Sequence, residues 1–244
     1  MFDGSIENPL ALGLFLILLA LCGPAGLIAV ISCRSPRETR LQTALALGAL
    51  AGLWLVLLPL SVLSAVLPSP LISIFGSEEM DTGLVEYATV LAWGLTAFVC
   101  VRIGNQNRSW NRLFYWAAAG VAIVLLGEEI SWGQWIFFWS SPELFAQSNL
   151  QGETNAHNFF PPEAFEAAYA LVGLAVAATA GFLRFSGHAG AISWSGLLWL
   201  RQSRWGAAMA FSAAVLMQHH FVQELSELAM AATALYAALW IRQA

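Results

Sequence analysis

The sequence predicts an all-α fold, a polytopic transmembrane helix bundle, and three observations support this class. The 244-residue chain is 59% hydrophobic and 10% charged, with a mean hydropathy of +0.69. A soluble domain of this size cannot bury that much apolar surface. Apolar stretches of roughly 20 residues, the length that crosses a bilayer, recur along the chain. The segments between them carry either arginines or acids. We therefore expect one integral membrane domain over residues 1–244.

The apolar stretches predict seven spans. The last apolar stretch, residues 206–241, would extend about 54 Å as a single helix, which is too long for one untilted crossing. We therefore expect it to divide into two short helices. The alternative is six spans that end in one long helix. The expected spans cover residues 9–32, 41–67, 85–103, about 113–139, about 166–184, about 206–221 and 225–241.

The charge pattern predicts the topology. All ten basic residues are arginines, and they fall in alternate connections and at the C-terminal end, whereas the other connections hold acids. Cytoplasmic loops retain basic residues, so we expect the N-terminus outside and the C-terminus in the cytoplasm. A composition without lysine favours a bacterium with a GC-rich genome, and therefore the bacterial inner membrane. The net charge of −5, with acids and bases on separate faces, does not fit a nucleic-acid partner.

The first candidate cluster lies within the fourth span, in the string GEEISWGQ. Glu128 and Glu129 are adjacent there. Acids inside a membrane cost a few kcal/mol each near its centre and by default mark a functional site. We predict a catalytic role for both, with Trp132 and Gln134 contacting the substrate. The alternative is a protonated, hydrogen-bonded pair that locks helices together.

The second cluster lies in the long outer loop, residues 140–165. Five polar residues follow one another closely, and a long loop inside a compact protein is usually functional or disordered. We predict that His157 is catalytic and that its neighbours bind the substrate. The alternative is a solvated loop that only caps the helices. These residues are Gln151, Glu153, Asn155, His157 and Asn158.

The third cluster precedes the last span. On a helix, His220, Glu224 and Glu227 follow i, i+4, i+7 spacing and share one face. Such a His/Glu pair suits a metal site or an acid–base pair. His219, His220, Glu224 and Glu227, together with His157, are therefore candidate ligands for zinc or iron. The alternative is a polar turn between two helices.

An electrostatic argument connects the three clusters. Every arginine is expected on the opposite face, so only histidine can pair with these acids. Buried carboxylates without partners are too costly to persist in the ionised form. Raised pKa values, imidazolium partners or a bound cation must therefore compensate. Each of these implies a chemically active site that opens to the extracytoplasmic side.

The favoured function is a membrane hydrolase acting on a small lipid-linked or peptide substrate. Glu128 or Glu129 would activate water, His157 or His220 would polarise the substrate or protonate the leaving group, and Glu224 would orient the imidazole. Three alternatives remain open: a zinc- or iron-dependent membrane enzyme, a proton- or cation-coupled transporter, and a structural subunit with a partner in a membrane complex.

Two resemblances bear on this prediction. The Glu128-Glu129 pair and the His220-x-x-x-Glu224 spacing resemble motifs of the CAAX-protease-like glutamic intramembrane peptidases, which implies water activated by a membrane glutamate. The chain departs from that family at Gly133, where the family has arginine, and at Glu224, where it has Asn or Asp. The strings GEEISWGQ and QGETNAHN are also similar to signatures of bacterial polytopic membrane proteins without an assigned activity.

Overall fold

The protein is described by a computed structural model, which covers residues 40–59, 83–107, 111–185, 204–216 and 223–243. Within these ranges the chain is helical and contains no β-strand, so the all-α class is confirmed for them. The first expected span, residues 9–32, lies outside the described residues.

The helices agree in position with most of the expected spans. Residues 85–103 fall within one helix, and the stretch from 206 to 241 contains two. The elements are α2 (Arg40–Ala51), the π-helical η1 (Gly52–Leu57), α5 (Leu84–Gln106), α6 (Asn111–Glu129), the 3-10 turn η2 (Ser131–Gly133), α7 (Gln134–Phe137), α8 (Glu143–Ser148), the 3-10 turn η3 (His157–Phe159), α9 (Pro162–Phe185), α11 (Arg204–Leu216) and α12 (Gln223–Gln243).

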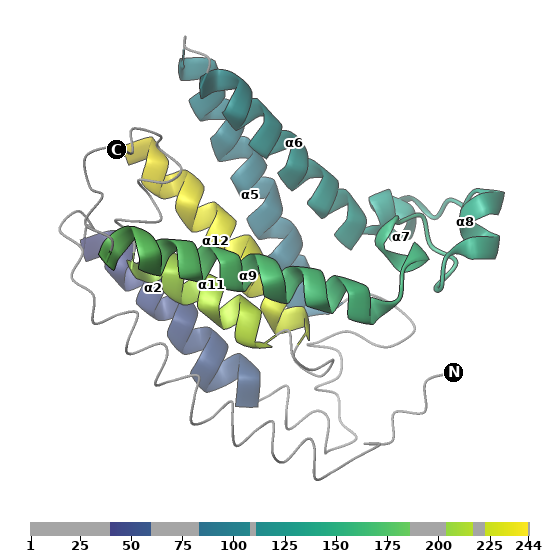
Figure 1. The fold of residues 1–244 in the computed structure, drawn as a ribbon. Helices are drawn as coiled ribbons and strands as arrows, with labels where there is room; N and C mark the ends of the chain where they lie inside the picture. Colours follow the sequence, from purple (N-terminus) through teal and green to yellow (C-terminus); the bar gives the residue numbers. More distant parts are fainter. Residues whose placement is uncertain (1–39, 60–82, 108–110, 186–203, 217–222, 244) are drawn as a thin grey trace.

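Helices α5 and α6 form an antiparallel pair (Figure 1). Two glycines of α5 leave room for large side chains of α6. A β-carbon at Gly94 would lie 3.3 Å from Leu126 Cδ1, and one at Gly104 would lie 3.1 Å from Trp116 Cδ1. This pairing brings the C-terminal end of α6 to the same end of the bundle as the start of α5.

Helix α12 packs along α5 and runs in the same direction. Leu225, near the start of α12, shares a core cluster with Val85 near the start of α5. Ala238, near the other end of α12, packs with Ile103 and Tyr115. The N-terminal turns of α12 therefore lie at the same end of the bundle as the end of α6, where the acidic residues occur.

The stretch from 206 to 241 folds into two helices, not one. The Ser226 hydroxyl of α12 donates a hydrogen bond of 2.7 Å to the Ala213 carbonyl of α11. Residues 13 positions apart would lie about 20 Å apart along one straight helix, so α11 and α12 fold back on each other. The alternative of one long final helix is wrong. Helix α9 covers α11, with Gly173 so close that a β-carbon there would lie 2.9 Å from the Ala210 carbonyl oxygen.

The expected fourth span, residues 113–139, is not one helix. Helix α6 ends at Glu129, and the next turn contains three positive φ angles, 46° at Ser131, 55° at Trp132 and 85° at Gly133. A right-handed helix cannot continue through left-handed residues. Hydropathy predicts a span that continues beyond Glu129, because the residues that follow the break are also apolar.

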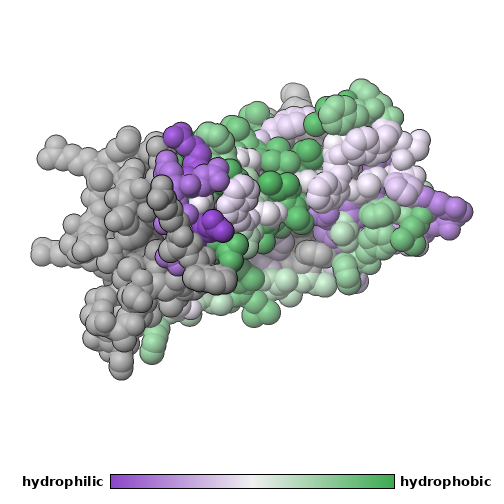
Figure 2. All heavy atoms as spheres, turned by 90° about the horizontal axis from the view of Figure 1, so that it is seen from above, coloured by the Kyte–Doolittle hydropathy of each residue, from purple (hydrophilic) through white to green (hydrophobic). Residues whose placement is uncertain are grey.

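Hydrophobic side chains cover much of the outer surface of the bundle. Figure 2 shows them, on one face, between two groups of hydrophilic residues. Leu91 and Phe98 on α5, Val121 on α6, and Leu171 and Phe182 on α9 are all more than half exposed. Of the helices in the described ranges, α5 (Leu84–Gln106) is the one long and apolar enough to cross a membrane, and half of its most apolar stretch is buried in the protein.

Charged residues of the α5–α6 pair separate between its two ends. Arg102, four residues before the end of α5, and Arg112, the second residue of α6, lie at one end. Glu86, Glu128 and Glu129 lie at the other, where the buried Glu86 carboxylate accepts a hydrogen bond of 2.7 Å from the Gly83 N–H. The pair thus has a basic end and an acidic end, as the sequence predicts.

Candidate functional site

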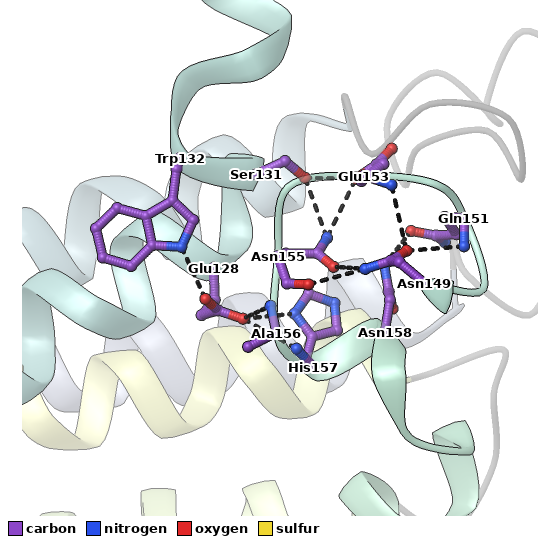
Figure 3. A network of polar contacts seen from close by, with 10 residues as sticks. All are labelled: Glu128, Ser131, Trp132, Asn149, Gln151, Glu153, Asn155, Ala156, His157 and Asn158. Carbon is purple, nitrogen blue, oxygen red and sulfur yellow. Dashed lines mark hydrogen bonds and ion pairs between the residues drawn. The ribbon is translucent and has the colours of Figure 1, made fainter. Parts of the chain in front are cut away.

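The site begins where α6 breaks. The left-handed turn after Glu129 returns the chain over the end of the helix, so that the ring of Trp132 lies against Gly127. In this position the Trp132 indole N–H donates a hydrogen bond of 2.8 Å to Glu128 Oε1 (Figure 3). The break therefore orients the Glu128 carboxylate from one side.

The outer loop supplies the other partners of Glu128. Glu128 Oε2 accepts the backbone N–H groups of Ala156 at 2.6 Å and of His157 at 3.0 Å. The same oxygen lies 3.4 Å from His157 Nδ1 (Figure 3). Glu128 and His157, which are 29 positions apart, are thereby joined, and hydrogen-bond donors of the protein surround much of the Glu128 carboxylate.

His157 is held beside Glu128 with part of its ring accessible. Its side chain is 35% exposed. Burial lowers the pKa of His157, while the nearby Glu128 carboxylate, and more weakly Glu153, act in the opposite direction. Burial is the larger effect, so the net shift of the pKa favours the neutral imidazole. A neutral imidazole next to a carboxylate has the composition of a general base with an orienting partner.

A second network, behind the first, is buried. The Ser131 hydroxyl donates to Glu153 Oε2, and Asn155 Nδ2 donates to the same oxygen at 3.2 Å and to Ser131 Oγ at 3.1 Å. Ser131 and Asn155 are each only 1% exposed. Asn149 completes the network, with its Nδ2 group 2.9 Å from Asn155 Oδ1. These residues fasten the outer loop to the break in α6.

The remaining polar residues of the loop lie towards its surface. Gln134 Oε1 accepts hydrogen bonds from the Thr154 N–H at 2.8 Å and from the Ser141 hydroxyl at 3.1 Å. Asn158 Nδ2 donates to Gln151 Oε1 at the exposed edge. The loop is therefore ordered by its own side chains, and the alternative of a merely solvated loop does not describe it.

The third predicted cluster reaches the same end of the bundle. The Tyr169 side chain on α9 interacts electrostatically with Glu227 of α12 and with Glu129 and Glu128 of α6. Glu227 and the adjacent glutamate pair, about 100 positions apart in the sequence, thus share one neighbour. That the first and third clusters form one site stays a prediction. The side chains of Glu224, His219 and His220 lie outside the described residues.

Some residues of the site were not expected from the sequence. Ser131, Asn149 and Ser141 were overlooked because serine and asparagine are common loop residues and no spacing distinguishes them. Tyr169 was also missed, although a tyrosine in the first turns of an apolar helix is a polar group that needs a partner. The predicted substrate-binding residues Glu153 and Asn155 direct their polar atoms into the protein, whereas Trp132, Gln151 and Asn158 remain near the surface.

A metal centre has no support in the part of the chain that the structure describes. No group of three His, Cys, Asp or Glu side chains there could hold an ion. The Glu128 oxygens already accept hydrogen bonds from three N–H donors, so most of the lone pairs of this carboxylate are used by the protein. The candidate ligands His219 and His220 lie outside this part.

No family model, curated protein or solved structure matches the chain. The inference of function therefore rests on the geometry of the site.

Proposed function

We propose that the chain is a multi-span protein of the bacterial inner membrane with its Glu/His site on the extracytoplasmic side. Two observations support this placement. Large apolar side chains on α5, α6 and α9 are exposed, which a water-soluble surface rarely tolerates over several helices. The arginines and acids of the α5–α6 pair occupy opposite ends, with the arginines at the end expected in the cytoplasm.

The proposed activity is hydrolysis of a lipid-linked or peptide substrate, with His157 as the general base. The pairing of Glu128 and His157 carries this proposal. Glu128 is fixed by three N–H donors and lies 3.4 Å from His157 Nδ1, so its role is to orient the imidazole. In this proposal the other ring nitrogen, Nε2, takes the proton from water.

This assignment changes the role expected for the first cluster. Three N–H donors fix the Glu128 carboxylate in place beside His157. In this proposal Glu128 therefore orients the imidazole, and His157 activates the water. The half-exposed Trp132, on the other side of Glu128, offers an aromatic surface for the apolar part of a substrate.

Hydrolysis can be tested without knowing the substrate. Protein in lipid nanodiscs would be incubated in ¹⁸O-water with a bacterial lipid extract or with a peptide library, and products would be analysed by mass spectrometry. We expect a product that carries ¹⁸O from the natural chain and from the control Gln147→Ala, which alters an exposed residue of α8. His157→Gln should abolish it.

Two outcomes would contradict the proposal. If the His157→Gln variant forms the ¹⁸O product at the natural rate, His157 is not the general base. If neither the lipid extract nor the peptide library gives an ¹⁸O product, the protein does not hydrolyse these classes of substrate.

A further inference from the structure

The segment just beyond α6 carries a group of apolar side chains that are exposed and that none of the described helices covers. Helix α7 and the residues after it contain Ile136, Phe137, Phe138 and Trp139, named here the aromatic tip. Phe137 is 70% exposed and Phe138 is 86% exposed. The rings of Phe137 and Trp139 stack with centroids 5.8 Å apart, so the tip is a defined surface.

The backbone at the centre of the tip is also unfavourable. Phe138 has a φ of 57°, in the left-handed region where glycine or asparagine is usual at the end of a helix. A bulky residue is disfavoured in this conformation, because its β-carbon lies too close to the following carbonyl oxygen. Phenylalanine at this position is therefore explained neither by burial in the protein nor by backbone preference. A surface outside the chain that buries the ring would explain why phenylalanine is found here.

The position of the tip indicates what that surface is. Helix α6 lies antiparallel along α5, the helix long and apolar enough to cross a membrane, and its 19 residues extend about 28 Å, close to the thickness of the hydrocarbon core of a bilayer. Its first turn holds Arg112 and its last residue is Glu129, so α7 begins where the hydrocarbon would end (Figure 1). Aromatic side chains are enriched at this depth, between acyl chains and headgroups.

The neighbouring helix α8 differs from the tip. Its exposed Gln147 and Glu143 side chains are hydrogen-bonded to each other at 3.0 Å, with the exposed Leu144 between them in the sequence. Gln134 and Ser141 attach the segment to Thr154 and Gly152 of the outer loop. The segment thus combines an aromatic part with a part that carries polar side chains, which is the composition of an interfacial element.

We propose that the aromatic tip inserts into the headgroup and acyl boundary of the outer leaflet and holds the Glu128–His157 site at the membrane surface. The inference rests on the membrane placement given under the proposed function, and not on the hydrolytic activity. It implies that a substrate reaches His157 from the lipid surface.

Spin labels can measure the depth of the tip. The three native cysteines would be replaced by alanine, and single cysteines would be introduced by Phe138→Cys, Gln147→Cys and Phe98→Cys. Phe98 is exposed on α5, towards its middle. Collision of each label with oxygen, which concentrates in lipid, and with a water-soluble nickel complex would be compared in nanodiscs that hold one copy of the chain.

We expect the oxygen-to-nickel ratio at 138 to lie several-fold above that at 147 and below that at 98. If the label at 98 lies in lipid and the ratio at 138 equals that at 147, the insertion of the aromatic tip would be overturned and the membrane placement would stand. Low collision with both reagents at 138 would also overturn it, because the tip would then be covered by protein. A label at 98 that collides freely with nickel would overturn the membrane placement as well.

Discussion

The ring of Trp132 lies against Gly127, five residues earlier in the chain. A β-carbon at Gly127 would lie 2.9 Å from three ring atoms, Cδ2, Cε2 and Cε3 of Trp132. Glycine is therefore required at this position for the chain to fold back over the end of α6. The contact also determines where the indole N–H points, and so the position of Glu128.

Replacing Gly127 with alanine should displace the indole ring and break its hydrogen bond to Glu128. Overpacking costs about 1–3 kcal/mol, against a gain of about 1 kcal/mol in helix propensity. We expect a net loss of unfolding free energy, measured by denaturant titration in detergent. Gly120→Ala is the control, because Gly120 is on the same helix with no atom within 4 Å of its would-be β-carbon. Equal effects of the two substitutions would contradict the prediction.

Asn155→Asp should loosen the outer loop. Asn155 is 1% exposed, and its amide nitrogen donates to Glu153 and Ser131. The aspartate would lose both donors and place a second carboxylate beside Glu153, at a cost of about 3 kcal/mol or more. Hydrogen exchange of residues 149–155 should accelerate. Asn158→Asp, the same change at the exposed edge of the loop, should have a much smaller effect, and an equal effect would show that the buried network is not what orders the loop.

Glu128→Gln should lower the pKa of His157 further. Burial lowers this pKa from its ordinary value of 6.5, and the Glu128 charge partly opposes the shift. Removing the charge leaves burial less opposed. Histidine-labelled protein would report the titration by NMR, and the spectrum of His157→Gln would assign the signal among the four histidines. Glu143→Gln, an exposed change on α8, should leave the titration unchanged. A pKa that rises in Glu128→Gln would contradict the proposed pairing.

The same lowered pKa makes stability depend on pH. The folded pKa of His157 lies below its unfolded value, so the unfolded chain binds more protons between the two values. His157 therefore contributes stability above the unfolded pKa, and this contribution is lost as the pH falls through the folded pKa. Unfolding of the natural chain and of His157→Gln would be compared between about pH 7.5 and about pH 5. We expect the natural chain to lose more stability over this range, and an equal loss would exclude His157 as the cause.

The sequence predicted the elements that depend on composition and the residues that are chemically unusual. Long apolar stretches gave the positions of α5 and α9, and adjacent acids in an apolar segment drew attention to Glu128. The break after Glu129 was not predictable, because it depends on three left-handed residues and on the fit of Trp132 over Gly127. The hydrogen-bond donors to Glu128 could not be predicted from the sequence either. Two of its three donors are backbone N–H groups, which every residue has, so no residue type signals them.

The two ends of the α5–α6 pair provide a direct test of the topology. Leu150→Cys places a thiol in the outer loop, where Leu150 is exposed, and Asn105→Cys places one at the arginine end of α5. Because arginines are retained in the cytoplasm, we expect an impermeant thiol reagent to label position 150 in intact cells and position 105 only after lysis. Equal lysed-cell labelling of both variants would control for reactivity. Labelling of 105 and not of 150 in intact cells would show that the topology is the inverse of the predicted one. The Glu128–His157 site would then lie in the cytoplasm, where a substrate from the outer leaflet could not reach it.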